Sequence, residues 1–167
     1  MKKNVLLKNQ QGFTLLEMMM VIVISLLMMA GVFGLVSMAT GNSKIKDAKQ
    51  NVATLRVGIQ NLYSDQKHFY TGLDNAVIKQ SKVVPDKMIK SGGNIKNVWN
   101  DDVTVAPLSG DITSFTIEYK GVPEDACIKM ATVNGFDKIS VGGTEVANVS
   151  DASNECASSG KITYQSR

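Results

Sequence analysis

Few residues of this 167-residue chain have the type and spacing needed for chemistry. The single histidine, His68, has no acidic or cysteine partner at a spacing typical of a metal or acid–base site, so a surface or core role is expected. The glycines in Gly92-Gly93 and Gly160-Lys161 do not complete a phosphate-binding loop. The sequence therefore predicts no enzyme, no metal and no cofactor.

The chain has two cysteines, Cys127 and Cys156, and no C-x-x-C motif. In an exported protein an even number of cysteines favours a disulfide. Closing a loop of about 30 residues would stabilise the fold by roughly 3–4 kcal/mol through chain entropy. Two free buried thiols are the alternative.

One carboxylate, Glu17, lies at the start of a long apolar segment. From Met18 to Val36 the chain is apolar apart from Ser25, and about 19 helical residues are just enough to cross a bilayer core of about 30 Å. A charge beside such a segment is costly in hydrocarbon and is a functional candidate. The alternative is a carboxylate at the headgroup level, beside the lysines of residues 2–8.

The run Gly12-Phe13-Thr14-Leu15-Leu16-Glu17 resembles the processing site of type IV prepilins. In that family a dedicated peptidase cuts after the glycine, methylates the new amino terminus and leaves the apolar segment in place. The resemblance implies a leader of residues 1–12 and a methylated Phe13 as the first mature residue. It also implies that the carboxylate of Glu17 neutralises the amino terminus of a neighbouring subunit during assembly.

A conventional secretory signal peptide is the main rival interpretation. Ser37-Met38-Ala39 offers a small-x-small cleavage pattern, and cutting there would release a soluble protein that starts at Thr40. The apolar run exceeds the usual 7–15 residues of such a signal. This rival also leaves Gly12 and Glu17 unexplained.

Beyond the apolar segment an amphipathic helical pattern continues without proline until Pro85. Apolar residues recur at alternating spacings of three and four: Ile45, Ala48, Val52, Leu55, Ile59 and Leu62. We therefore predict one helix from about Phe13 to about Gln66. Residues 13–40 form its transmembrane and polymerisation half, and residues 41–167 form a globular head that contains the rest of the helix.

The remainder of the head predicts strands and short helices. Ile112 to Lys120 alternates apolar and polar residues, as an antiparallel strand with one buried face does. Further expectations are a short helix at Leu73 to Gln80, strands at Val103 to Val105, Phe136 to Val141 and Lys161 to Gln165, a helix starting near Pro123, and a polar loop between Gly142-Gly143 and Lys161. The predicted class is α+β, a long helix packed by its second half on an antiparallel sheet.

The formal charge is +3, and the leader holds three lysines and no acid. The processed chain is thus formally neutral, which argues against charge-driven nucleic-acid binding.

Asn97-Val98-Trp99 before the first strand, and Val122-Pro123 before Cys127, resemble the type IVb pilins of conjugative thin pili and enteric colonisation pili. Phe13 and the short leader are closer to type IVa. The resemblance implies the pilin fold and a subunit that polymerises with itself into an extracellular filament for adhesion, aggregation or mating contact. A minor pilin, a type II secretion pseudopilin and a soluble binding domain, secreted or membrane-anchored, are the alternatives.

The same resemblance implies the partners and the location. The partners would be prepilin peptidase, a pilus assembly ATPase, an inner-membrane platform protein and an outer-membrane secretin. The subunit would lie in the inner membrane of a Gram-negative bacterium before assembly, and in a pilus on the cell surface afterwards.

Overall fold

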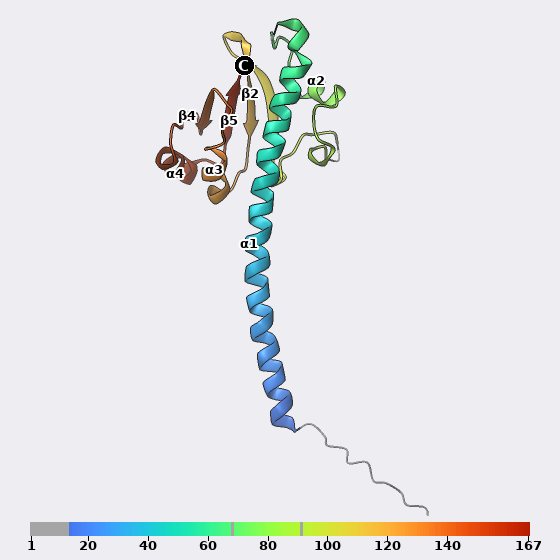
Figure 1. The fold of residues 1–167 in the computed structure, drawn as a ribbon, viewed down its shortest axis with the longest axis vertical. Coiled ribbons are helices and arrows are strands. Elements are labelled where there is room, and N and C mark those ends of the chain that lie inside the picture. Colours follow the sequence, from blue (N-terminus) through green and yellow to red (C-terminus); the bar gives the residue numbers. More distant parts are fainter. Residues whose placement is uncertain (1–13, 68, 91) are drawn as a thin grey trace, which may run out of the picture. The chain divides into compact units, whose positions relative to one another are not determined.

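The structure is a computed structural model that describes residues 14–67, 69–90 and 92–167, with the backbone alone for residues 30–40. The chain divides into two compact units, Met1–Thr40 and Gly41–Arg167, and each is described by itself. Helix α1 (Leu15–Leu62) contributes to both, and the second unit adds a five-stranded sheet and shorter helices (Figure 1). The predicted α+β class is confirmed.

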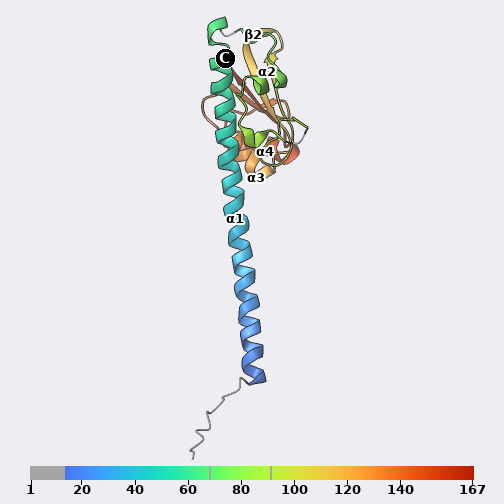
Figure 2. The same ribbon diagram turned by 90° about the vertical axis from the view of Figure 1, so that its right-hand side faces the viewer.

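In the second unit α1 buries the predicted apolar stripe, except that Leu62 at its end is only partly buried. Ile45, Ala48, Val52, Leu55 and Ile59 are all at most 6% exposed, because residues three and four apart share one face of a helix. This part of α1 runs along one face of the sheet (Figure 2).

The helix ends at Leu62, four residues earlier than predicted. A short 3₁₀ turn, η1 (Ser64–Gln66), follows, and Lys67 adopts a left-handed conformation with φ of 54°. The hydroxyl of Ser64 donates a hydrogen bond to the carbonyl of Asn61 at 2.9 Å. Serine competes for helix carbonyls in this way, and the left-handed Lys67 ends the 3₁₀ turn that follows the helix.

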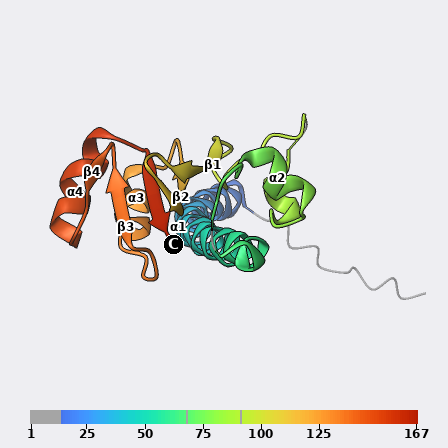
Figure 3. The same ribbon diagram turned by 90° about the horizontal axis from the view of Figure 1, so that it is seen from above.

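The sheet is antiparallel throughout, with the strand order β1-β2-β5-β3-β4 (Figure 3). Its strands are β1 (Val103–Leu108), β2 (Asp111–Tyr119), β3 (Lys138–Val141), β4 (Thr144–Glu145) and β5 (Ile162–Ser166). The register aligns Val105, Ile117, Tyr164 and Ile139 in one row across four strands. All four are buried, so the alternating pattern of β2 predicts the inner face correctly.

Helix α1 also holds the sheet through polar contacts. The Arg56 guanidinium donates to the hydroxyl of Ser166 at 2.9 Å and lies 5.4 Å from the ring centre of Phe136. The amide of Gln60 donates to the carbonyl of Arg167. These contacts fix the last strand, β5, against the helix.

The free edge of β1 is covered by the start of α2 (Asn75–Gln80). The Asn75 amide donates to the carbonyl of Val103 at 2.8 Å and accepts from the N–H of Val105 at 2.8 Å. These two hydrogen bonds take the place of those that a neighbouring strand would make with Val103 and Val105. They protect an edge that could otherwise pair with a strand of another chain. A second 3₁₀ turn, η2 (Asp86–Met88), follows in the same connection.

The segment predicted as a polar loop before β5 contains a helix, α4 (Val149–Ser158). Asn148 caps it by accepting a hydrogen bond from the N–H of Asp151 at 2.9 Å. Ala152 and Cys156, four residues apart, form its buried side. The loop prediction is wrong because two small buried residues are too weak an apolar pattern to recognise in a polar sequence.

A disulfide joins α4 to α3 (Glu124–Met130) through Cys127 and Cys156, with the Cα atoms 5.8 Å apart. Both residues are buried. The two cysteines predicted to pair are therefore bonded, and the bond holds two short helices that have little apolar surface of their own.

We predict that replacing both Cys127 and Cys156 with serine lowers the free energy of unfolding by about 3–4 kcal/mol, because the unfolded chain gains the entropy that the closed loop removes. Denaturant unfolding of the full chain in detergent, followed by the fluorescence of Trp99, measures this. A reductant should lower the stability of the wild type equally and leave the double variant unchanged. A loss below about 1 kcal/mol would contradict the entropic role.

Two tyrosines of the core differ in how their hydroxyls are satisfied. Tyr119 and Tyr164 are fully buried, with rings 6.2 Å apart in an edge-to-face arrangement. The Tyr164 hydroxyl donates to the carbonyl of Met130 at 3.3 Å, whereas the Tyr119 hydroxyl has no partner within the described residues. Burial raises the pKa of both hydroxyls above the ordinary value, so both stay neutral.

We predict that Tyr119→Phe raises the free energy of unfolding by about 1 kcal/mol, because it removes a buried hydroxyl without a partner. Tyr164→Phe is the matched control and should lower it by about 1 kcal/mol, since a hydrogen bond is lost. The same unfolding assay compares them. Equal effects of the two variants would show that Tyr119 has a partner.

Candidate functional site

The first unit presents an apolar helical surface on every side. Between Leu15 and Met29, thirteen large apolar side chains are each 54–80% exposed. The hydroxyl of Ser25 donates to the carbonyl of Val21 at 2.7 Å, so this polar group is satisfied within the helix. A helix that is apolar all round is unfavourable in water and requires lipid or other apolar protein surfaces around it.

No helix within the described residues combines the length and the apolar character needed to cross a membrane.

The segment predicted to cross the membrane, residues 13–40, includes residue 13 and the side chains of residues 30–40. These lie outside the described part of the chain. Membrane crossing thus stays a prediction.

Helix α1 begins with a capping arrangement around Thr14 and Glu17. The N–H of Glu17 donates to the hydroxyl oxygen of Thr14 at 3.3 Å and to its carbonyl oxygen at 3.0 Å. Thr14-x-x-Glu17 matches the capping-box pattern, which the sequence analysis did not identify. Glu17 also lies in the first turn, where the helix dipole favours an acidic group. Its position therefore has a local cause in addition to any role in assembly.

Glu17 supplies an exposed anionic acceptor at one end of the apolar surface. If that surface is covered by lipid or protein, an unpaired carboxylate there would be costly, so the site favours a cation from outside the chain. Gly12 and Phe13, the predicted processing residues, lie outside the described residues, as does His68.

The exposed apolar surface with one carboxylate at its end is suited to association with other apolar surfaces. Within the described ranges, no group of three or more histidine, cysteine, aspartate or glutamate side chains could hold a metal ion. Cys127 and Cys156 lie in the other unit and are used up in the disulfide. Trp99 packs against the core, and Asn148 serves as the cap of α4.

Two family models match the chain. The model described as PilS N terminal matches residues 24–165, and the model of the prokaryotic N-terminal methylation motif matches residues 7–33.

Two curated relatives are each described as the major structural subunit of the bundle-forming pilus. The protein from Escherichia coli O127:H6 (strain E2348/69 / EPEC) is 23% identical over 164 residues, covering 93% of this chain and 84% of the relative. The protein from Escherichia coli O111:H- is 25% identical over 129 residues, covering 76% and 66%.

Two solved structures share the fold, although sequence identity to them is low. A type IV b pilin from Salmonella typhi superposes with a TM-score of 0.55 at 20% identity, covering 70% of this chain and 95% of that one. TcpA, a type IV pilin from Vibrio cholerae El Tor biotype, gives a TM-score of 0.54 at 11% identity, covering 75% and 99%. Because the family model spans residues 24–165 and the methylation motif covers the start of the apolar helix, the chain belongs to the PilS family.

Proposed function

We propose that this chain is a structural subunit of a type IV pilus of the IVb kind, polymerised through its N-terminal helix into an extracellular filament. The observation that carries this proposal is the all-round apolar exposure of α1 between Leu15 and Met29, with one carboxylate at its start. Such a helix needs an apolar partner on every side, and a bundle of identical helices provides it. The named functions of the two bundle-forming pilus relatives support this role.

Assembly would proceed from the membrane. Prepilin peptidase cuts after Gly12 and methylates Phe13, and the subunit waits in the inner membrane of a Gram-negative cell. Lipid and packed apolar helices are similar in polarity, so transfer from one to the other need not cost much. The carboxylate of Glu17 then pairs with the new amino terminus of a neighbouring subunit, in surroundings where either charge alone would be costly.

The remaining partners would be those that lift a subunit out of the membrane and let the filament leave the cell. We assign these roles to an assembly ATPase, an inner-membrane platform protein and an outer-membrane secretin. The filament would serve adhesion, aggregation or mating contact. In this proposal the chain is a structural protein and not an enzyme.

A secreted domain that starts at Thr40 has less support. Cleavage there would discard all of residues 7–33, which match the methylation motif, and the first part of the match to the PilS family. Those residues would then serve only as a signal, although they include the Thr14 cap and the Glu17 carboxylate.

We predict that the mature protein begins at Phe13 with one added methyl group. Amino-terminal sequencing and intact mass of the protein from its native cells measure this. The mass should also be lower by two hydrogen atoms, which the thiols of Cys127 and Cys156 lose when their disulfide forms. Gly12→Ser is the matched variant, expected to remain unprocessed because its leader no longer ends in glycine. A start at Thr40 would overturn the proposal.

We further predict that Glu17→Gln is processed normally but yields at least about tenfold fewer surface filaments, because it leaves an amino terminus without an anionic partner. Glutamine retains the capping pattern, so this variant removes the charge alone. Thr14→Ala is the control: it removes the cap, keeps the charge, and should lower the yield much less. Filament yield in sheared fractions is the measurement, and a normal yield from Glu17→Gln would contradict the charge-pairing role.

A further inference from the structure

Lysines from two distant segments of the head meet around one open pocket. Residues 44–49 contain three lysines and one aspartate, and residues 82–96 contain four lysines and one aspartate. The fold brings the start of the head's part of α1 beside η2 and the loop that follows it, and encloses a pocket of about 280 Å³. Four cations line this pocket, which we call the lysine cup: Lys44, Lys87, Lys90 and Lys96.

Acidic side chains neutralise only part of the lysine cup. The ammonium of Lys96 lies 2.8 Å from a carboxylate oxygen of Asp102, and that of Lys87 lies 3.9 Å from Asp47. Such exposed ion pairs are weak and leave the ammonium groups able to exchange partners. The other two lysines of the cup are exposed and have no ion-pair partner among the residues that the structure describes: Lys44 and Lys90.

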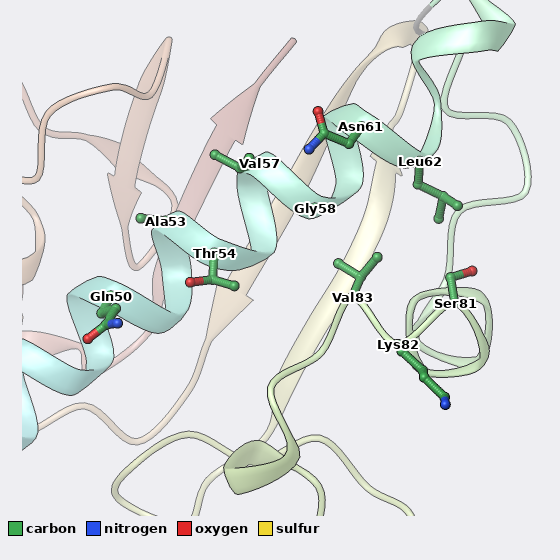
Figure 4. A pocket seen from close by; sticks show the side chains of 10 residues that line it. All are labelled: Gln50, Ala53, Thr54, Val57, Gly58, Asn61, Leu62, Ser81, Lys82 and Val83. Atoms are coloured by element: carbon green, nitrogen blue, oxygen red, sulfur yellow. The ribbon is translucent and has the colours of Figure 1, made fainter.

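Close packing holds the segment that carries two of these lysines against α1. Figure 4 shows Val83 lying against Gly58, and a Cβ atom at position 58 would lie 2.5 Å from Val83 Cγ1. Glycine therefore allows this approach. Further along the segment the side chain of Met88 is buried, and its carbonyl accepts a hydrogen bond from the N–H of Lys96 at 2.8 Å. The core thus fixes the backbone around the lysine cup before any ligand binds.

The lysine cup is also tied by the chain to the apolar segment. Lys44 follows Val36, the last residue of that segment, by eight residues, since 44 − 36 = 8. Eight residues span about 12 Å as a helix and at most about 28 Å when fully extended. Lys44 therefore stays close to the surface of any membrane that holds the apolar segment. Lysines on a translocated flank run against the usual charge bias of membrane proteins, which favours a use for them at that surface.

We propose that the lysine cup binds the phosphate headgroups of anionic phospholipids and holds the head on the outer surface of the inner membrane until assembly. This inference rests on the proposed function and adds a lipid partner to its membrane stage. Attraction of lysines to an anionic membrane falls off within a Debye length of about 8 Å. The contact therefore acts on a subunit that is still in the membrane, and it is lost when the subunit enters the filament.

Lysine acylation, quantified by mass spectrometry, tests this contact on the processed full chain in lipid nanodiscs. We expect Lys44 and Lys90 to react at least about fivefold more slowly in nanodiscs with anionic phospholipid than in purely zwitterionic ones. Lys129, exposed on α3 and outside the lysine cup, should slow by less than about twofold. Equal slowing at all three lysines would overturn the inference, because it would reflect a general effect of the charged bilayer on the reagent.

Two variants with the same net charge separate the lysine cup from overall charge. In wild type Lys87 should also be protected by the anionic bilayer. Lys44→Gln combined with Lys90→Gln should reduce this protection to less than about twofold, because both unpaired cations are lost. Lys67→Gln combined with Lys129→Gln, which changes two exposed lysines outside the cup, should preserve it. Full protection of Lys87 in the first variant would contradict the role of the cup.

Two soluble ligands identify the source of the phosphate. Inorganic phosphate and a short DNA duplex are each added to the chain in detergent, and neither should slow acylation of Lys44 or Lys90 as the anionic bilayer does. Equal protection by either would overturn the lipid assignment in favour of that ligand. A chain that enters nanodiscs without this protection refutes the lipid contact alone, whereas a mature chain that starts at Thr40 refutes the proposed function.

Discussion

The need to cover the apolar surface of α1 is the constraint on which the rest of the molecule depends. Thirteen large apolar side chains between Leu15 and Met29 are exposed together. Removing apolar surface from water contributes about 25 cal/mol per Å² of buried area, so any state in which lipid or protein covers this helix is favoured. The carboxylate of Glu17 at one end of this surface is a second constraint. Arrangements that neutralise its charge are favoured over arrangements that leave it unpaired. The proposed transfer of subunits from lipid to filament would satisfy both requirements.

In the head, by contrast, the apolar side of α1 is already covered by the rest of the fold. The stripe from Ile45 to Ile59 is buried with the inner face of the sheet in one core. Polar contacts complete this core: Arg56 reaches Ser166, and Asn75 occupies the edge of β1. The disulfide joins α3 and α4, whose own buried residues belong to the same core. A head held by its own core can present outer surfaces to neighbouring copies without unfolding.

Sequence patterns predict the parts of the fold that bury a regular stripe. Spacings of three and four identify the α1 stripe, and strict alternation identifies the inner face of β2, because burial itself imposes these periods. Features that depend on single hydrogen bonds are harder. The end of α1 at Leu62 is followed at once by a 3₁₀ turn that ends at a left-handed Lys67, and α4 depends on the Asn148 cap and two small buried residues. The Thr14 cap carries a recognisable pattern and could have been identified.

One residue of the candidate site can be identified from the sequence alone. Glu17 stands out in the sequence because a charge beside an apolar run is unusual, and the structure places it, exposed, in the first turn of α1. In the proposed function, a helical array of copies would cover the apolar helix on every side and supply each Glu17 carboxylate with a neighbouring amino terminus.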